Sequence, residues 1–250
     1  MKNTIETTII EWQGFTGVSF EFDCAPAKLI RPSGEPNGKW ALKTEYFGAF
    51  PNAELELLRR GWHLAYIKND NRWAQERDLA RKAEFVRFIS EQFGLERRCS
   101  LIGMSCGGLF AVLLAARIPE LIDVLYLDAP VLNLLSCPCD MGVASSGLYE
   151  EFYRFTGRTR SEMLSYREHP IDKLPILLAH NIPVVLVAGE CDRTVPYAEN
   201  GAILAKEYRA QGGRLWLHLK ADCDHHPHGL ANPISLVDAI EAFAKKKASK

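Results

Sequence analysis

Ser105 lies in a Gly-x-Ser-x-Gly segment, residues 103–107, where one apolar run ends and a second one, of helical character, begins. The pattern is typical of a nucleophile elbow, a sharp strand-to-helix turn with a serine at its apex, because the flanking glycines remove side chains that would block the crossing. The free N–H groups at the start of the following helix favour negative charge beside the serine. We therefore predict that Ser105 is a nucleophile and that the N–H of Cys106 is half of an oxyanion hole.

The neighbouring segments favour this prediction over a turn that merely joins two elements. Residues 99–103 predict a short buried strand, and residues 109–118 form an apolar run, typical of a buried helix, that ends at Pro119. A nucleophile elbow requires a strand, a sharp turn and a helix in this order.

An activated serine needs a base to take its proton and an acid to orient that base. Asp192 follows an apolar run, residues 182–188, that is typical of a central parallel strand. His225 lies in the loop after the last predicted strand, residues 214–219. We predict that His225 is the base and Asp192 its acid, because both follow strand ends and the chain order is serine, aspartate, histidine.

Other acids remain open for the same role. Asp128 also ends a predicted strand, and Glu190 lies close to Asp192 in the same loop. An aspartate in such a loop can also serve only as a turn or helix cap. The placement and the chain order favour Asp192 as the triad acid.

The loop that holds His225 also contains His226 and His228, and three imidazoles with Cys223 could ligate zinc. Pro227 breaks any helical i, i+4 pairing of these histidines, and no distant Cys/His cluster completes a site. We therefore expect no metal and no cofactor. His226 and His228 are then either candidate substrate-binding residues or solvated surface side chains.

Composition excludes several other classes of protein. The 250 residues carry a formal net charge of −1, which removes the broad electrostatic argument for nucleic-acid binding. The N-terminal residues 1–11 lack the apolar core of a signal peptide, and no uncharged run approaches the length of a membrane span. Seven scattered cysteines do not suit a disulfide framework in a chain of this size, so we expect a cytoplasmic protein without membrane contact.

The order of predicted elements indicates an α/β fold in a single domain, residues 1–250. An N-terminal antiparallel hairpin precedes strands that alternate with helices, which implies a mostly parallel sheet covered on both faces, with functional loops at the carboxyl ends of its strands. Residues 131–179 mix turn residues with short helical pieces and predict a small cap or lid insertion over a site. The predicted strands are 7–12, 18–24, 27–31, 62–67, 99–103, 123–128, 182–188 and 214–219, and the predicted helices are 53–60, 73–93, 109–118, 197–211 and 234–247.

The second oxyanion donor is expected in a loop that follows the third strand of such a sheet. Residues 32–40 come after the third predicted strand, and their glycines and prolines indicate a long, shaped loop. Lys39 and Trp40, at the end of this loop, are the best candidates for the second donor.

From about residue 27 to its end, the chain resembles a bacterial α/β-hydrolase of the serine esterase kind. Three segments carry the resemblance: the elbow at 103–107, a Gly-Glu-x-Asp-x-x-Val-Pro segment at 189–196, and the His-His-Pro-His segment at 225–228. The chain is also similar to a subset with Leu-Asp-Ala-Pro after the sixth strand, whose members resemble carbohydrate or carboxylic esterases. In the family a glycine usually precedes the histidine, whereas Asp224 stands here, so His226 stays an alternative to His225 as the base.

The resemblance implies that the protein cleaves a small-molecule carboxylic ester through a Ser-His-Asp triad and an acyl-enzyme intermediate. A serine peptidase or amidase would use the same triad and is the alternative within the enzymes, although the predicted cap is small. The third hypothesis is a non-catalytic binding module with the same fold. The presence of all three triad candidates favours an enzyme over such a module.

Overall fold

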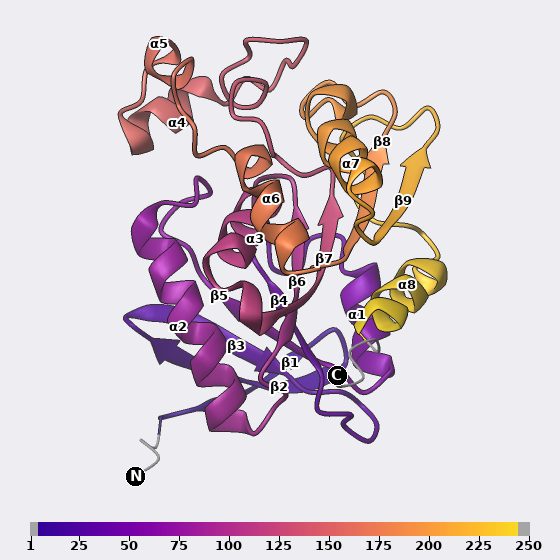
Figure 1. Ribbon diagram of the computed structural model, residues 1–250. Helices are drawn as coiled ribbons and strands as arrows, with labels where there is room; N and C mark the ends of the chain where they lie inside the picture. Colours follow the sequence, from indigo (N-terminus) through magenta and orange to yellow (C-terminus); the bar gives the residue numbers. More distant parts are fainter. Residues whose placement is uncertain (1–4, 245–250) are drawn as a thin grey trace.

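Nine strands form one sheet within residues 5–244, the part of the chain that the computed structural model describes, in the order β1-β2-β3-β5-β4-β6-β7-β8-β9 (Figure 1). Strands β1, β2 and β3 are antiparallel, β3 also pairs antiparallel with β5, and the remaining pairs are parallel. The strands are β1 (Thr8–Trp12), β2 (Phe15–Phe22), β3 (Ala25–Ile30), β4 (Trp40–Lys43), β5 (His63–Ile67), β6 (Cys99–Met104), β7 (Ile122–Asp128), β8 (Val184–Gly189) and β9 (Leu215–Lys220).

The N-terminal hairpin joins β1 to β2 through a two-residue turn, with Trp12 opposite Phe15. Gln13 and Gly14 in this turn have positive φ values of 53° and 80°. Two successive positive φ values are typical of the type I′ turn, whose twist matches that of the flanking strands. The predicted antiparallel hairpin is therefore confirmed.

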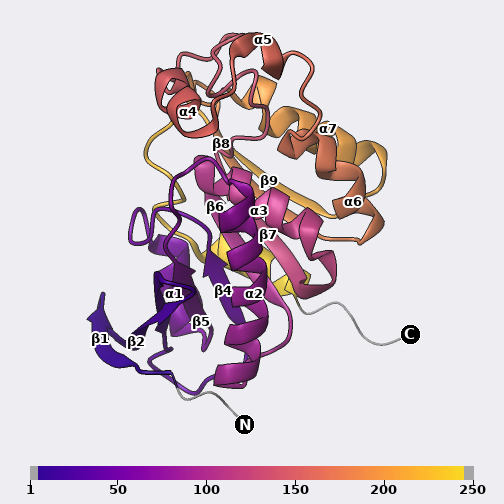
Figure 2. The same ribbon diagram turned by 90° about the vertical axis from the view of Figure 1, so that its left-hand side faces the viewer.

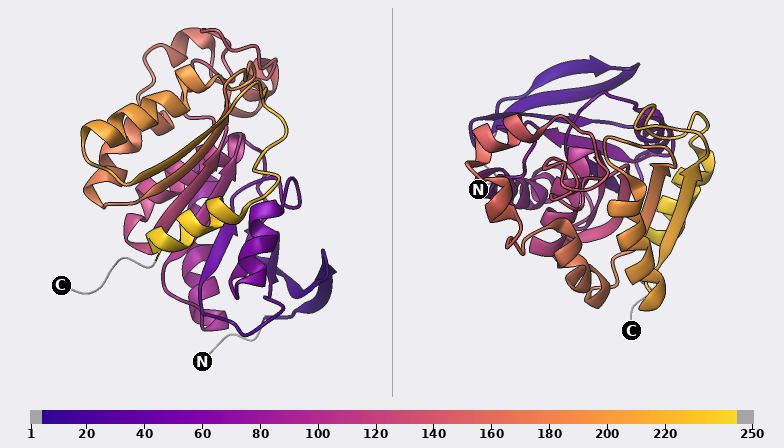
Figure 3. Two further views of the ribbon diagram at one scale, coloured as in Figure 1. Left: turned by 90° about the vertical axis from the view of Figure 1, so that its right-hand side faces the viewer. Right: turned by 90° about the horizontal axis from the view of Figure 1, so that it is seen from above.

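Helices cover both faces of the sheet. On one face lie α2, α3, α6 and α7, and on the other lie α1 and α8, which contact each other (Figure 3). Successive side chains of the strands alternate between the two cores, so that Leu101 packs into the first and Ile102 into the second. The helices are α1 (Asn52–Arg59), α2 (Glu76–Phe93), α3 (Cys106–Arg117), α4 (Tyr149–Thr156), α5 (Arg160–Met163), α6 (Leu174–Ala179), α7 (Gly201–Ala210) and α8 (Ile234–Ala244).

This architecture confirms the predicted fold class, a mostly parallel sheet between two helical layers. Each predicted strand is present with ends shifted by at most a few residues, as is usual for such boundaries. The predicted terminal helix is α8, and its last predicted residues, 245–247, lie outside the described residues. No helix among residues 5–244 combines the length and the apolar character that crossing a bilayer requires.

Two features differ from the predictions. Trp40 is the first residue of β4, a central strand of only four residues. The sequence predicts a loop that ends at Trp40 and no strand directly after it. The predicted cap, residues 131–179, includes α4 and α5 above the carboxyl ends of the strands, but its last part is α6, which packs against α3 in the helical layer (Figure 2). Only the earlier part of the insertion therefore covers the edge of the sheet.

Helix α3 runs through the interior, because most of its residues are apolar and buried. Its first turn lies so close to the segment after β7 that a β-carbon on Gly108 would be 2.3 Å from Cβ of Pro130. We expect Gly108→Ala to lower the free energy of unfolding by about 1–3 kcal/mol, because the added methyl group must push two backbone segments apart.

Urea denaturation measures this effect, and Gly34→Ala is its matched control. A β-carbon on Gly34 would have no atom within 4 Å, so we expect this exposed substitution to change stability by less than about 0.5 kcal/mol. Equal stability of Gly108→Ala and wild type would contradict the close approach of α3 to Pro130.

Candidate active site

The carboxyl ends of four neighbouring parallel strands carry the predicted chemical groups. Ser105 follows β6, Asp128 ends β7, Asp192 lies in the loop after β8, and His225 lies in the loop after β9. Because these ends meet at one edge of the sheet, side chains far apart in sequence come together there.

Ser105 occupies the sharp turn between β6 and α3, with φ 50° and ψ −123°. This region of backbone space is sparsely populated for non-glycine residues, and such strain costs on the order of 1–3 kcal/mol. Gly103 permits the turn, because a β-carbon at this position would lie 2.5 Å from the carbonyl oxygen of Gly107. The local geometry is therefore that of the predicted nucleophile elbow.

His225 lies between Ser105 and Asp192. Its Nε2 is 3.0 Å from Oγ of Ser105, and its Nδ1 is 2.7 Å from Oδ2 of Asp192. All three residues are buried, with exposed fractions of 9% for Ser105, 7% for His225 and 5% for Asp192. When Nδ1–H donates to the carboxylate, the lone pair of Nε2 faces the serine hydroxyl, and this tautomer can accept its proton.

The loop around Asp192 holds its carboxylate in this orientation. Oδ1 accepts hydrogen bonds from the backbone N–H groups of Thr194, at 2.9 Å, and Val195, at 2.8 Å. Oδ2 is thereby left for His225. These two hydrogen bonds fix the rotation of the carboxylate, so Oδ2 stays directed at the imidazole.

Asp224, which stands where a glycine was expected, links the acid loop to the histidine loop. Its Oδ1 accepts hydrogen bonds from the backbone N–H groups of Arg193, at 3.0 Å, and His225, at 2.7 Å. These two hydrogen bonds hold the pKa of Asp224 below its usual value. Asp224 therefore positions His225 relative to the acid loop.

His226 does not lie between the serine and an acid. It is exposed, and its ring stacks on Phe50 with centroids 5.5 Å apart and an interplanar angle of 14°. Partial burial, together with the neighbouring His228 and His225 rings, lowers the pKa of His226. The geometry thus favours His225 over His226 as the base, and leaves His226 on the wall of the site.

His228 is buried, with an exposed fraction of 5%, so its interpretation as a solvated surface side chain is wrong. Its Nδ1 is 2.7 Å from Oδ1 of Asp128, while Oδ2 of the same carboxylate accepts the N–H of Gly229 at 2.6 Å. Asp128 is thus engaged by a second histidine. The other alternative acid, Glu190, is exposed.

Cys106 is the first residue of α3, so its backbone N–H has no acceptor within the helix and lies beside Ser105. Its side chain is completely buried, and this burial raises the pKa of the thiol to about 11. The thiol is therefore protonated at neutral pH and does not compete with the serine as a nucleophile.

Lys39 and Trp40, the predicted second oxyanion donors, lie at the opposite end of the sheet. The parallel register pairs Ala41 of β4 with Ser100 of β6, so Trp40 is level with the start of β6, roughly 20 Å from Ser105 at ~3.3 Å per residue. The indole Nε1 of Trp40 donates to the carbonyl of Glu96 at 2.8 Å, and Lys39 forms an ion pair with the same residue at 3.9 Å. This prediction is wrong because the loop precedes β4 instead of following it.

Tyr46 follows the carboxyl end of β4 and lines the same pocket as Ser105, a position that the sequence did not reveal. Its backbone N–H donates to Oε1 of Glu45 at 3.2 Å. Its hydroxyl lies beside the Cys106 thiol and 3.5 Å from Nη1 of Arg72. Burial raises the pKa of Tyr46, so the hydroxyl keeps its proton and can donate it to a developing negative charge.

The pocket above Ser105 has a volume of about 290 Å³. Its walls come from the loop after β4, from Ser146 and Leu148 of the insertion, and from the three histidines of the loop after β9. Arg72 also lines it and binds Glu151 of α4 through Nε at 2.8 Å and Nη2 at 2.9 Å. This volume is at the lower end of the range of small-molecule sites, which favours a small ligand.

Three solved structures have the same fold. They are an acylaminoacyl peptidase from Pyrococcus horikoshii (14% identity, TM-score 0.69, covering 100% of this chain and 43% of that chain), a Porphyromonas gingivalis dipeptidyl peptidase 4 (14%, 0.64, 98% and 36%) and a puromycin hydrolase (16%, 0.65, 96% and 38%). The chain thus spans less than half the length of each of these proteins. At such identities the likeness shows the fold.

The sequence itself provides a more specific relationship. Residues 60–250 match the sequence model of the prolyl oligopeptidase family, Peptidase_S9. This match includes the elbow, the acid loop and the histidine loop, and it extends over most of the chain. The protein therefore belongs to the prolyl oligopeptidase family.

Proposed function

We propose that the protein is a serine hydrolase in which Ser105, His225 and Asp192 catalyse acyl transfer to water. The observation that carries this proposal is the continuous chain of hydrogen bonds from Oγ of Ser105 through the imidazole of His225 to the carboxylate of Asp192. The strained elbow and the adjacent helix start support it, because they present the serine beside a free N–H.

In the first half of the reaction, Oγ of Ser105 bonds to the substrate carbonyl carbon while Nε2 of His225 takes the hydroxyl proton. The N–H of Cys106 and the hydroxyl of Tyr46 donate to the resulting oxyanion. His225 then gives its proton to the leaving group as the bond to the carbonyl carbon breaks. In the second half, His225 takes a proton from a water molecule as the water oxygen bonds to the acyl carbon. His225 then returns this proton to Oγ of Ser105 as the bond from Oγ to the acyl carbon breaks, and the acid is released.

We propose an amide bond in a small peptide or acylated amine as the bond that is cleaved. The family match and the peptidases among the structural neighbours favour amides over the carboxylic esters of the first hypothesis. The pocket volume of about 290 Å³ favours a small acyl group. Carboxylic ester hydrolysis remains the second candidate, because the same triad also reacts with esters.

A pair of substrates with one acyl group distinguishes the two bonds. We expect the protein to hydrolyse both the nitroanilide and the nitrophenyl ester of one N-acetylated dipeptide. A fluorophosphonate that labels Ser105 should inhibit both reactions. Turnover of the ester alone, across several acyl groups, would contradict the amide proposal and favour the ester. Absence of labelling at Ser105 would contradict the hydrolase itself.

Tyr46→Phe tests the second oxyanion donor. Removal of one such donor lowers kcat by about 10²–10³-fold, and we expect this loss with little change in KM, because the hydrogen bond forms fully only in the transition state. Tyr153→Phe is the matched control, because its exposed ring lies on α4 and we expect unchanged kcat. If Tyr46→Phe kept the wild-type kcat, Tyr46 would not be the second oxyanion donor.

A further inference from the structure

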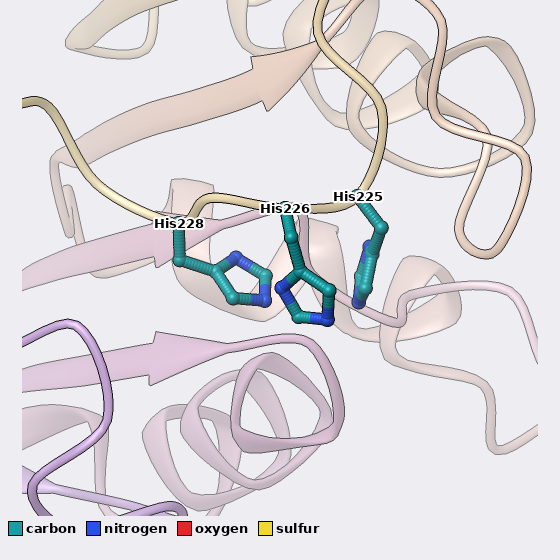
Figure 4. Close-up of side chains that lie close together, drawn as sticks. All are labelled: His225, His226 and His228. Atoms are coloured by element: carbon teal, nitrogen blue, oxygen red, sulfur yellow. The ribbon is translucent and has the colours of Figure 1, made fainter.

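The three histidines of the loop after β9 form a compact cluster at the mouth of the pocket. The ring centroids of His225, His226 and His228 are 4.8–4.9 Å apart in each pair, and the rings meet edge to face. One ring nitrogen from each residue lies within 4.8 Å of the other two. Figure 4 shows the three side chains extending from one stretch of loop to the same side.

Two histidines of the cluster, His225 and His228, each have Nδ1 hydrogen-bonded to a buried carboxylate. Asp192 binds Nδ1 of His225, and Asp128 binds Nδ1 of His228, in each case at 2.7 Å. In a neutral imidazole with Nδ1–H donated in this way, Nε2 carries the lone pair that ligates a metal. A carboxylate behind each ligating imidazole fixes its tautomer and the orientation of its ring, as in many zinc sites.

The proposed acyl transfer uses only one of these two pairs. Asp128 and His228 are almost fully buried, and they are not needed to activate Ser105. Asp128 is held further by the N–H of Gly229 and by the hydroxyl of Tyr126, at 2.6 Å and 3.2 Å. The proposed acyl transfer therefore gives no role to His228, although its ring is buried and oriented by a carboxylate.

We propose that His225, His226 and His228 bind a divalent transition-metal ion of the Zn²⁺ type, and that the bound ion inhibits the hydrolase. Nε2 of His225, Nε2 of His228 and one ring nitrogen of His226 are the ligands, with a fourth position open toward the pocket. Two nitrogens that each bind a tetrahedral zinc at about 2.0–2.1 Å lie about 3.4 Å apart. The ligand atoms now lie within 4.8 Å of one another, so their separations must shorten by at most roughly 1.4 Å. The exposed side chain of His226 has the freedom to make most of this movement.

The inhibition rests on the proposed function and follows from competition for one lone pair. The lone pair of His225 Nε2 accepts the Ser105 proton, and a metal ion that occupies it removes the general base. The metal-free protein is then the active form, and chelators leave its activity unchanged. Imidazole ligands suit zinc, copper and nickel, whereas magnesium prefers oxygen ligands, so Mg²⁺ serves as the control ion.

Metal binding is tested without any turnover by calorimetric titration of the Ser105→Ala protein with Zn²⁺. Co²⁺ serves as a second probe, since its visible absorption reports coordination. We expect one Zn²⁺ per chain and no heat from Mg²⁺. His226→Asn, made at an exposed position that leaves the fold intact, should weaken Zn²⁺ binding at least about tenfold, and Asp128→Asn should weaken it about 10–100-fold through the loss of the carboxylate behind His228.

His218→Asn is the matched control, because His218 is an exposed histidine of β9 outside the cluster. We expect it to leave both Zn²⁺ affinity and hydrolase activity unchanged. If His226→Asn and Asp128→Asn left the Zn²⁺ affinity unchanged, the proposed metal site would be refuted. An absence of stoichiometric Zn²⁺ binding would refute it as well.

The inhibitory role is tested separately in the wild-type protein. We expect Zn²⁺ to block fluorophosphonate labelling of Ser105, EDTA to restore it, and His226→Asn to shift the inhibitory Zn²⁺ concentration upward by the same factor as the affinity. Loss of activity on chelation, restored by Zn²⁺, would overturn inhibition in favour of a catalytic metal. Zinc binding in a protein that hydrolyses no substrate would leave the site standing and refute the proposed function instead.

Discussion

Ser105→Ala is expected to reduce turnover of both the amide and the ester substrate by about a thousandfold or more, by analogy with other triad knockouts. The substitution removes the only atom that bonds to the substrate carbonyl carbon, while the rest of the pocket is unchanged. It removes one hydroxyl whose hydrogen-bonding partner is Nε2 of His225. We expect the free energy of unfolding to change by less than about 0.5 kcal/mol, because the strained backbone is the same with either residue.

Steady-state kinetics and urea denaturation of the same preparation measure the two quantities. Ser165→Ala, an exposed serine of the insertion, is the matched control and should retain wild-type turnover and fluorophosphonate labelling. If Ser105→Ala kept turnover near wild type in a clean preparation, the nucleophile assignment would be refuted. If it unfolded instead, the serine would have a structural role that its single hydrogen bond does not indicate.

The elbow and the triad could be predicted because their signals are local. The glycine at 103 is required by the contact that a β-carbon would make with Gly107, so the motif reports a backbone crossing. Asp192 and His225 each follow a strand with a clear apolar or alternating pattern, and the carboxyl ends of parallel strands share one edge. Their proximity to Ser105 could therefore be predicted although they are far from it in the sequence.

Tyr46, the proposed second oxyanion donor, could not be predicted because the strand before it is short and contains a charge. Strand β4 has only four residues, and its Lys43 is buried against Glu54 of α1, so the apolar run that marks a central strand is interrupted. Without a signal for β4, the sequence places the loop that ends at Trp40 at the wrong end of the sheet. For the same reason the sequence does not indicate Tyr46, which follows β4.

The pairing of His228 with Asp128 is the other feature that sequence reasoning missed. The two residues are 100 positions apart, and neither the loop after β9 nor the end of β7 has a pattern that indicates the other. A histidine beside a proline in a polar loop is usually solvated. Burial here follows from packing of the loop against the end of β7, which only the tertiary structure determines.

His225→Ala is expected to match Ser105→Ala in severity with the amide substrate, and the double variant to be no worse than either single one. Serine and base act as one unit, so removing both loses little more than removing one. The loss should be smaller with the nitrophenyl ester. Its leaving group departs as an anion without protonation, whereas an amine needs the proton that His225 supplies.

The two other histidines of the loop are the matched controls for this prediction, compared through kcat/KM with kcat and KM resolved separately. His226 touches the pocket but not the serine, so we expect His226→Ala to retain turnover with altered KM. His228→Ala should also retain turnover, because the 3.0 Å contact to Ser105 and the 2.7 Å contact to Asp192 belong to His225. If His226→Ala were inactive and His225→Ala active, the assignments of the elbow and the acid would stand. The base would then be His226, one residue further along this loop.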